Sequence, residues 1–117
     1  MQFIWYPRCT TCQRAKKFLD ENAVKYEVRD IVKQPLNKDE LRDVAKKGGL
    51  EIKKMFNTSG IKYREMSLKD KLKDMNDDEK YALLASDGML VKRPVLIGDD
   101  FAAVGFKEDK YKELLNL

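Results

Sequence analysis

The sequence contains no histidine and only two cysteines, Cys9 and Cys12. A structural zinc site takes four ligands, most often cysteine and histidine. One chain of this composition would need carboxylates, or residues of a second subunit, to complete such a site. We therefore expect no metal centre, and the two thiols need another explanation.

The sequence also lacks an apolar run long enough to cross a bilayer, and Met1 leads directly into an expected strand rather than into a signal peptide. We expect a cytoplasmic protein without a membrane partner. Disulfides in that compartment are mostly transient and serve catalysis or redox sensing rather than stability. The cysteine pair accordingly favours redox chemistry over a structural cross-link.

No long linker rich in proline, glycine or serine interrupts the 117 residues, which predicts one domain over 1–117. The content of 43% hydrophobic residues is enough for a packed core. The net charge of +4 is a mild excess, and charges of both signs alternate in stretches such as "KDKLKD". Because no basic stripe is interleaved with aromatic residues, we expect no direct binding of nucleic acid.

The first thirty residues predict a strand, a helix and a second strand. Residues 3–6 form a short aromatic and β-branched run. A helix follows, with Thr10 as the expected N-cap and Gln13 completing a capping box. Residues 25–30 alternate in polarity, as a half-exposed strand does. Because a helix lies between them, the two strands should be parallel.

A block of helices is expected next. Asn37 is the expected N-cap of a helix, with Glu40 completing its capping box and the pair Gly48-Gly49 ending it. Residues 56–65 are rich in turn-forming residues and predict an irregular segment. Further helices are expected over 68–74 and from the cap Asn76 to the pair Asp87-Gly88.

The last quarter of the chain predicts a hairpin and a closing helix. Residues 95–98 and 101–104 are the expected strands, joined by a tight turn. A helix from about Lys107 would place Tyr111 on its inner face. The sequence thus predicts an α/β fold, with a helical insertion over about 36–87 between its two sheet-forming parts.

The cysteines form a Cys-x-x-Cys motif at the expected helix start, with Cys9 just outside the helix and Cys12 in its first turn. A helix N-terminus presents unpaired N–H groups and a partial positive charge, both of which favour thiolate over thiol. Cys9, next to Arg8, is therefore the candidate nucleophile. Cys12 lies one turn on and is the candidate resolving thiol, able to close a disulfide with Cys9.

Two other interpretations of the pair stay open. The thiols could bind a metal together with carboxylates or a second subunit, or they could be two small core residues. Core cysteines seldom occur as a spaced pair between a proline and a helix cap. We therefore favour redox chemistry.

Four segments, in this order along the chain, resemble the arsenate reductase and Spx family, also called the ArsC family: "YPRCTTCQRAKKFL", "FNTSGIKYRE", "KRPVLI" and "VGFKED". The resemblance covers essentially the whole chain. It implies a thioredoxin-like fold, in which a central mixed sheet carries a helical insertion between a βαβ half and a ββα half.

The resemblance also implies roles for individual residues. Cys9 matches the attacking cysteine, Cys12 the resolving or switch cysteine, and Arg93 the arginine that precedes the proline motif. A cis bond before Pro94 would present the backbone, and the charge of Arg93, beside Cys9. A proline at the first position of a strand is also tolerated without any such role. The implied supporting or binding residues are Arg8, Thr10, Thr11, Asn57 and Pro94.

The segment "FNTSG" has two interpretations. Its Asn, Ser and Gly residues form turns, and turn chemistry alone explains most of it. Under the resemblance, Asn57, Thr58 and Ser59 would lie near the cysteine loop and could hydrogen-bond an incoming group.

This sequence departs from the arsenate reductases that it resembles. Those enzymes surround the oxyanion with three arginines, whereas Asn57 stands at the second position here and no arginine follows Arg93. One fixed charge is a poor clamp for a doubly charged oxyanion. Lys92, Lys107 or Arg64 would have to substitute, and a lysine lacks the bidentate fork of an arginine. We expect arsenate reduction to be weak or absent.

The arsenate reductases of this type commonly have a serine where Cys12 stands and use glutathione, so Cys12 suggests internal resolution. The sequence predicts a cytosolic thiol-disulfide oxidoreductase with no resident cofactor. Thioredoxin, glutaredoxin or a small thiol would act as external reductant, and a thiol or disulfide protein or a small oxidant as partner of a monomer. The alternative is an Spx-like redox switch that binds the C-terminal domain of the RNA polymerase α subunit, although such regulators usually have a longer C-terminal tail.

Overall fold

A four-stranded mixed sheet forms the centre of the computed structural model, which describes all residues 1–117. The strand order is β2-β1-β3-β4. As predicted, β1 and β2 are parallel, while β3 is antiparallel to both β1 and β4. The strands are β1 (Gln2–Trp5), β2 (Glu27–Asp30), β3 (Val95–Ile97) and β4 (Ala102–Val104).

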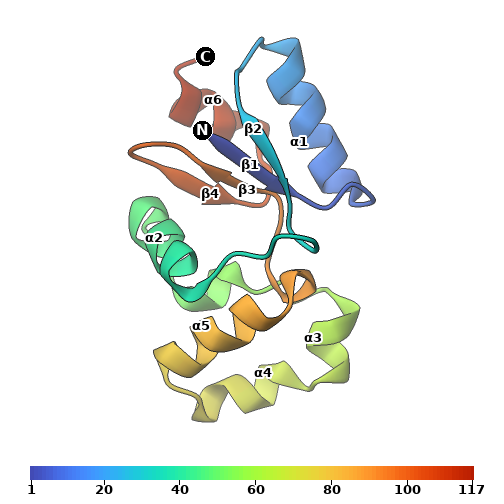
Figure 1. Ribbon diagram of the computed structural model, residues 1–117, viewed down its shortest axis with the longest axis vertical. Helices are drawn as coiled ribbons and strands as arrows, with labels where there is room; N and C mark the ends of the chain where they lie inside the picture. The colour runs from blue at the N-terminus through green and yellow to red at the C-terminus, as the bar shows by residue number, and fades with distance from the viewer.

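One face of the sheet packs against two helices, one from the first part of the chain and one from its last part. Phe3, Leu96 and Ala103 are in register across β1, β3 and β4, and their side chains share one face because side chains alternate along a strand. They pack with Phe18 of helix α1 (Thr10–Glu21) and Tyr111 of helix α6 (Glu108–Leu115). Figure 1 shows α1 and α6 at the end of the molecule that also holds the two termini.

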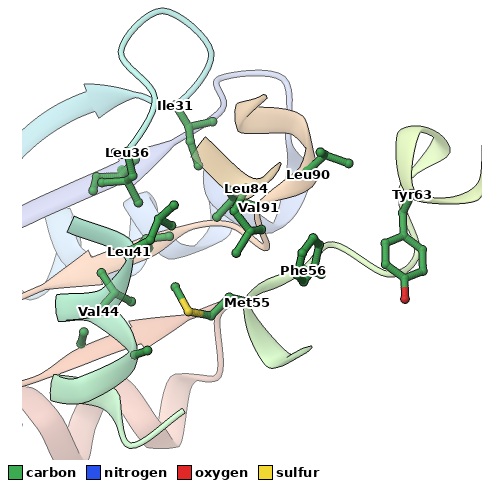
Figure 2. Close-up of a cluster of buried hydrophobic side chains, with 14 of the residues drawn as sticks. Ile31, Leu36, Leu41, Val44, Met55, Phe56, Tyr63, Leu84, Leu90 and Val91 are labelled. Carbon is green, nitrogen blue, oxygen red and sulfur yellow. The ribbon is translucent and has the colours of Figure 1, made fainter. Parts of the chain in front are cut away.

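The opposite face of the sheet packs against the helical segment that connects β2 to β3. Ile4 and Val95 point to this side and join a cluster of 16 buried residues. In Figure 2, side chains of α2 such as Leu41 point toward Met55 and Leu84 within the same cluster. The segment contains α2 (Lys38–Gly48), η1 (Ile52–Met55), α3 (Ile61–Glu65), α4 (Leu68–Lys71), η2 (Leu72–Asp74), α5 (Asp77–Ser86) and η3 (Gly88–Leu90).

Local sequence signals locate the longer helices correctly. Asn37 and Glu40 form the predicted capping box of α2, and Asn76 and Glu79 form one at α5. Gly49, at φ 59°, takes the left-handed conformation that ends α2, which glycine adopts without steric cost. The central mixed sheet with its inserted helices is the thioredoxin-like arrangement that the sequence predicts.

Two local predictions are wrong. The segment 56–65 is not irregular throughout, because α3 occupies Ile61–Glu65. The only buried residue of α3 is Tyr63, whose ring centroid lies 6.2 Å from that of Phe56. A helix of five residues is not stable alone, so burial of this tyrosine selects the helical turn over the turn propensity of the sequence.

The N-cap of α1 is Cys9 rather than Thr10. The chain reverses at Pro7 and Arg8, and the amide of Cys9 donates to the carbonyl of Tyr6 at 2.9 Å. This turn brings the sulfur of Cys9 over the first helical amides, so the helix starts one residue earlier than predicted. The Gln13 side chain donates to the carbonyl of Pro7 at 2.7 Å instead of closing a capping box.

The edge strand β2 is tied to the helical segment by one ion pair. Val28 is 51% exposed, so β2 contributes little apolar burial at this edge. Arg29 instead donates two hydrogen bonds to the carboxylate of Glu40, at 2.6 and 3.0 Å. Glu40 also accepts the amide of Asn37, which joins the ion pair to the capping box of α2.

The mutation Glu40→Gln should make the free energy of unfolding less dependent on acidic pH. The hydrogen bonds from Arg29, opposed by partial burial, hold the pKa of Glu40 below its ordinary value. A carboxyl whose pKa is lowered by folding stabilises the protein above its unfolded pKa of about 4.3, and that contribution is lost as the pH falls further. Urea unfolding at pH values from about 6 to about 3 measures this.

Glu51→Gln is the control, because Glu51 is exposed and makes no ion pair. The stability difference between wild type and Glu40→Gln should shrink toward the acidic end, while Glu51→Gln follows wild type throughout. A constant difference for Glu40→Gln across this range would contradict the assigned role of its charge.

Candidate functional site

The two cysteines lie at the start of α1, directly after the turn that leaves β1. Both are free thiols. The sulfur of Cys9 accepts a hydrogen bond from the backbone amide of Cys12, with 3.4 Å between nitrogen and sulfur. The first amides of a helix have no intrahelical partner, so the sulfur satisfies one of them and lies at the positive end of the helix dipole. The side chain of Cys9 is thereby held at the helix start.

Cys12 has a different environment although it is only three residues further on. Its side chain is fully buried. Burial raises the pKa of Cys12 well above its ordinary value, and the neighbouring Cys9 adds to this rise. The Tyr6 backbone and the charge of Arg93 offset the rise only in part. Cys12 is therefore a protonated thiol at neutral pH, shielded behind the half-buried Cys9.

The Arg93-Pro94 peptide bond is cis. The guanidinium of Arg93 lies over the ring of Tyr6, 5.3 Å from its centroid, and donates to the carbonyl of Met89 at 3.4 Å. Its Nε is buried without a hydrogen-bond partner. Pro94 accepts the amide of Gly105 at 2.8 Å, which joins the start of β3 to the end of β4.

A cavity of about 730 Å³ opens beside Cys9. Four of the residues singled out in the sequence line it together: Cys9, Thr11, Asn57 and Arg93. The lining does not include Arg8 and Thr10, which are exposed, or Pro94, which is buried. Within "FNTSG", Ser59 also lines the cavity and donates to the side-chain oxygen of Asn57 at 3.3 Å, whereas Thr58 does not line it.

The expectation of one fixed charge beside Cys9 is wrong, because six basic residues line the cavity and no acidic residue does. Of the residues that the sequence suggested as substitutes for the missing arginines, Lys92 and Lys107 line the cavity and Arg64 does not. Lys107 could be found from the quoted motif "VGFKED", but Lys54 and Lys110 reach the cavity only through the packing of η1 and α6. The six are Arg14, Lys54, Lys92, Arg93, Lys107 and Lys110.

The backbone conformation at position 105 favours glycine. Gly105 has a φ of +75°, in the left-handed region that other residues rarely adopt. A Cβ atom there would also lie 3.0 Å from the Cε atom of Lys92. The side chain of Lys92 therefore lies across Gly105 at the wall of the cavity.

No group of three or more cysteine, aspartate and glutamate side chains is placed to hold a metal ion. The helices of this chain are also too short or too polar for any of them to cross a membrane.

Comparison with known proteins gives concordant matches over nearly the whole chain. The model of the ArsC family matches residues 4–114. The uncharacterized protein YusI of Bacillus subtilis is 50% identical over 113 residues, which cover 97% of this chain and 96% of YusI.

One solved structure and one regulator extend this comparison. The crystal structure of an ArsC-family-related protein from Bacteroides fragilis superposes with a TM-score of 0.93 at 45% identity, covering 97% of this chain and 95% of that one. The global transcriptional regulator Spx 1 of Bacillus cereus is 25% identical over 109 residues, which cover 93% of this chain and 82% of the regulator.

Cys9 should be alkylated at least about tenfold faster than Cys12 at pH 7, because each unit by which a pKa is raised removes about nine-tenths of the reactive thiolate. Cys12 is in addition fully buried. Brief iodoacetamide treatment followed by peptide mass spectrometry measures both rates in one sample. In denaturant the two rates should converge, and equal rates in the folded protein would show that Cys12 is not shielded.

Proposed function

The chain belongs to the ArsC family, and from this premise we propose that it is a thiol-disulfide oxidoreductase in which Cys9 attacks and Cys12 resolves. The observation that carries the proposal is the position of Cys9. Its sulfur caps α1 and accepts the amide of Cys12, and it borders the cavity of about 730 Å³. A thiol in such a place is both activated by the helix and accessible to a substrate.

The first step is attack of the Cys9 thiolate on one sulfur of a substrate disulfide. A bond forms between Cys9 and that sulfur, the substrate S–S bond breaks, and the second substrate sulfur leaves as a thiolate that takes up a proton. The product is a mixed disulfide between Cys9 and half of the substrate.

The second step uses Cys12. Its thiol loses a proton and attacks the sulfur of Cys9, which releases the second half of the substrate as a thiol. The protein dithiol is oxidised by two electrons, and one substrate disulfide becomes two thiols. Burial keeps Cys12 protonated until the mixed disulfide has formed, which supports the order of the two steps.

Arg93 is proposed to support both thiols and the incoming group. Its charge favours the thiolate of Cys12, and Arg93 lines the cavity together with Cys9. Return to the dithiol requires an external reductant, for which thioredoxin, glutaredoxin or a small thiol is suited. The cytoplasmic location and the monomeric state remain predictions.

A redox-switched regulator that binds RNA polymerase is the second candidate. The relatives that bear the name of transcriptional regulator share about a quarter of their residues with this chain, as Spx 1 of Bacillus cereus does. YusI is twice as similar and has no function in its name. No contact or surface of this chain favours the switch, so the oxidoreductase is the preferred proposal.

The roles of the two thiols should separate in single variants. Cys9→Ser should abolish mixed-disulfide formation with a small disulfide, whereas Cys12→Ser should accumulate it, because the resolving thiol is missing. Intact-protein mass spectrometry resolves the adduct, and wild type should form the Cys9-Cys12 disulfide instead. Accumulation in Cys9→Ser rather than in Cys12→Ser would exchange the two roles.

Arsenate reduction should be weak or absent. Arg14 and Arg93 are the only arginines that line the cavity, and the guanidinium of Arg93 already contacts Tyr6. Each charged hydrogen bond contributes about 1.5 to 3 kcal/mol, so lysines in place of bidentate arginines should weaken oxyanion binding by orders of magnitude. The assay is arsenate-dependent oxidation of the reduced protein, with glutathione and glutaredoxin or thioredoxin supplied.

Arg93→Ala is the comparison variant in that assay. Robust turnover by wild type that disappears in Arg93→Ala would contradict this prediction and identify an arsenate reductase.

A further inference from the structure

The basic residues around the cavity are mostly without ion-pair partners. Five of the six make no salt bridge, and Lys110 makes only a long one, with 3.9 Å to Glu113. Elsewhere some cations are paired, as Arg29 is with Glu40 and Lys62 with Asp87, whereas the cavity wall holds no acidic residue. Unpaired charges of one sign around a concave surface sum to a field that attracts anions.

Two buried polar groups at the cavity lack partners. Tyr111 is 1% exposed and its hydroxyl makes no hydrogen bond, and the Nε atom of Arg93 is also unpaired. Both residues line the cavity. Buried polar groups in folded proteins are nearly always satisfied, so these two donors are available to a ligand. Both atoms are covered in this structure, so a ligand reaches them only after a small side-chain movement.

The hydroxyl of Tyr111 is suited to donate to an anion. Burial, with a smaller contribution from Cys12, raises the pKa of Tyr111 above its ordinary value. The hydroxyl therefore keeps its proton at any physiological pH.

The size and composition of the cavity fit a ligand much larger than one oxyanion. A volume of about 730 Å³ lies in the range of pockets for drug-sized molecules. Its cations come from separate segments, α1, η1, the start of β3 and α6, rather than from one point. Four of the six are lysines, which bind phosphate or carboxylate as point charges and do not form a bidentate fork. Leu50 and Phe106 add apolar surface to the cavity wall.

We propose that this cavity binds a polyanionic low-molecular-weight disulfide, whose sulfur meets Cys9 while its phosphate or carboxylate groups lie against the lysines, Arg14, Arg93 and the Tyr111 hydroxyl. The inference rests on the proposed function in that Cys9 is the nucleophile. It adds the substrate class and assigns a binding role to residues such as Lys54, Lys110 and Tyr111, which the cysteine motif does not specify.

The reaction balances with this substrate. The Cys9 thiolate bonds to one sulfur and expels the other as an anionic thiol, and Cys12 then closes the intramolecular disulfide and expels the second anionic thiol. The protein dithiol and one disulfide yield the protein disulfide and two small thiols. A concave site walled by four segments favours this small molecule over an acidic protein chain.

The first experiment measures binding without chemistry. In Cys9→Ser, titration calorimetry compares three disulfides with the same pantetheine arms: pantethine, which has no phosphate, 4′-phosphopantethine, and coenzyme A disulfide. Affinity should rise with phosphate number, by about tenfold or more from the first to the third, and the gain should fall with added salt. Oxidised glutathione, which carries carboxylates and no phosphate, tests whether carboxylates can replace phosphates in binding. Equal affinity of pantethine and coenzyme A disulfide, or no binding of either, would overturn the proposal.

The second experiment uses charge variants in the same calorimetric assay. The triple change Lys54→Gln, Lys92→Gln and Lys107→Gln should remove most of the preference for coenzyme A disulfide. The matched control, Lys33→Gln, Lys46→Gln and Lys71→Gln, removes the same charge from exposed lysines without ion pairs outside the cavity and should keep the preference. An equal loss in both triples would assign the effect to net charge alone and overturn the site.

Tyr111→Phe separates binding from folding. Its hydroxyl has no partner in the protein, so the variant should unfold at the same or a slightly higher urea concentration. Affinity for coenzyme A disulfide should nevertheless fall about fivefold, as loss of one hydrogen bond does. Unchanged affinity would remove Tyr111 from the site.

Reaction of wild-type protein distinguishes the failure of this inference from failure of the proposed function. Diamide, which is uncharged, should produce the Cys9-Cys12 disulfide, and coenzyme A disulfide should do so faster than pantethine. No intramolecular disulfide with any oxidant would refute the oxidoreductase, while the Cys9→Ser titration still decides the anion site. A disulfide-linked acidic peptide that reacts faster than coenzyme A disulfide would replace the small molecule with a protein substrate.

Discussion

The capping of helix α1 by Cys9 is the constraint on which the environment of both thiols depends. The turn after β1 brings the Cys9 sulfur to the first helical amides, where it accepts the Cys12 amide. Cys12 lies one helical turn further on, in the interior, where burial keeps its thiol protonated. Two identical thiols three residues apart thereby acquire opposite properties: one faces a cavity and the other is shielded behind it.

Basic residues from several segments of the chain surround this site. No charged residue is buried as a whole, so the cations of the chain lie at or near its surface. Ion pairs such as the one between Arg29 and Glu40 neutralise part of that charge elsewhere. Around Cys9 there is no acidic partner on the cavity wall, so the positive field at the cavity is uncompensated. Gly105 contributes by leaving room for the Lys92 side chain.

The accuracy of the sequence-based predictions follows the range of the interactions involved. The capping boxes at Asn37 and Asn76 are correct because donor and acceptor lie within three residues of each other. The cap of α1 is displaced to Cys9 because the preceding turn decides which side chain reaches the free amides. The helix α3 is missed because the burial of Tyr63 outweighs the local preference for turns.

The order of the four strands and of helices α1, α2, α5 and α6 could be predicted from the sequence, as could the parallel pairing of β1 with β2 and the cysteine pair at a helix start. Hydrophobic periodicity and local hydrogen bonding are enough for these features. That Lys54 and Lys110, 56 positions apart in the numbering, line the cavity with Cys9 is a consequence of long-range packing. Their approach depends on how the helical segment and α6 pack around the sheet, and exposed lysines leave no periodic pattern from which that packing could be predicted.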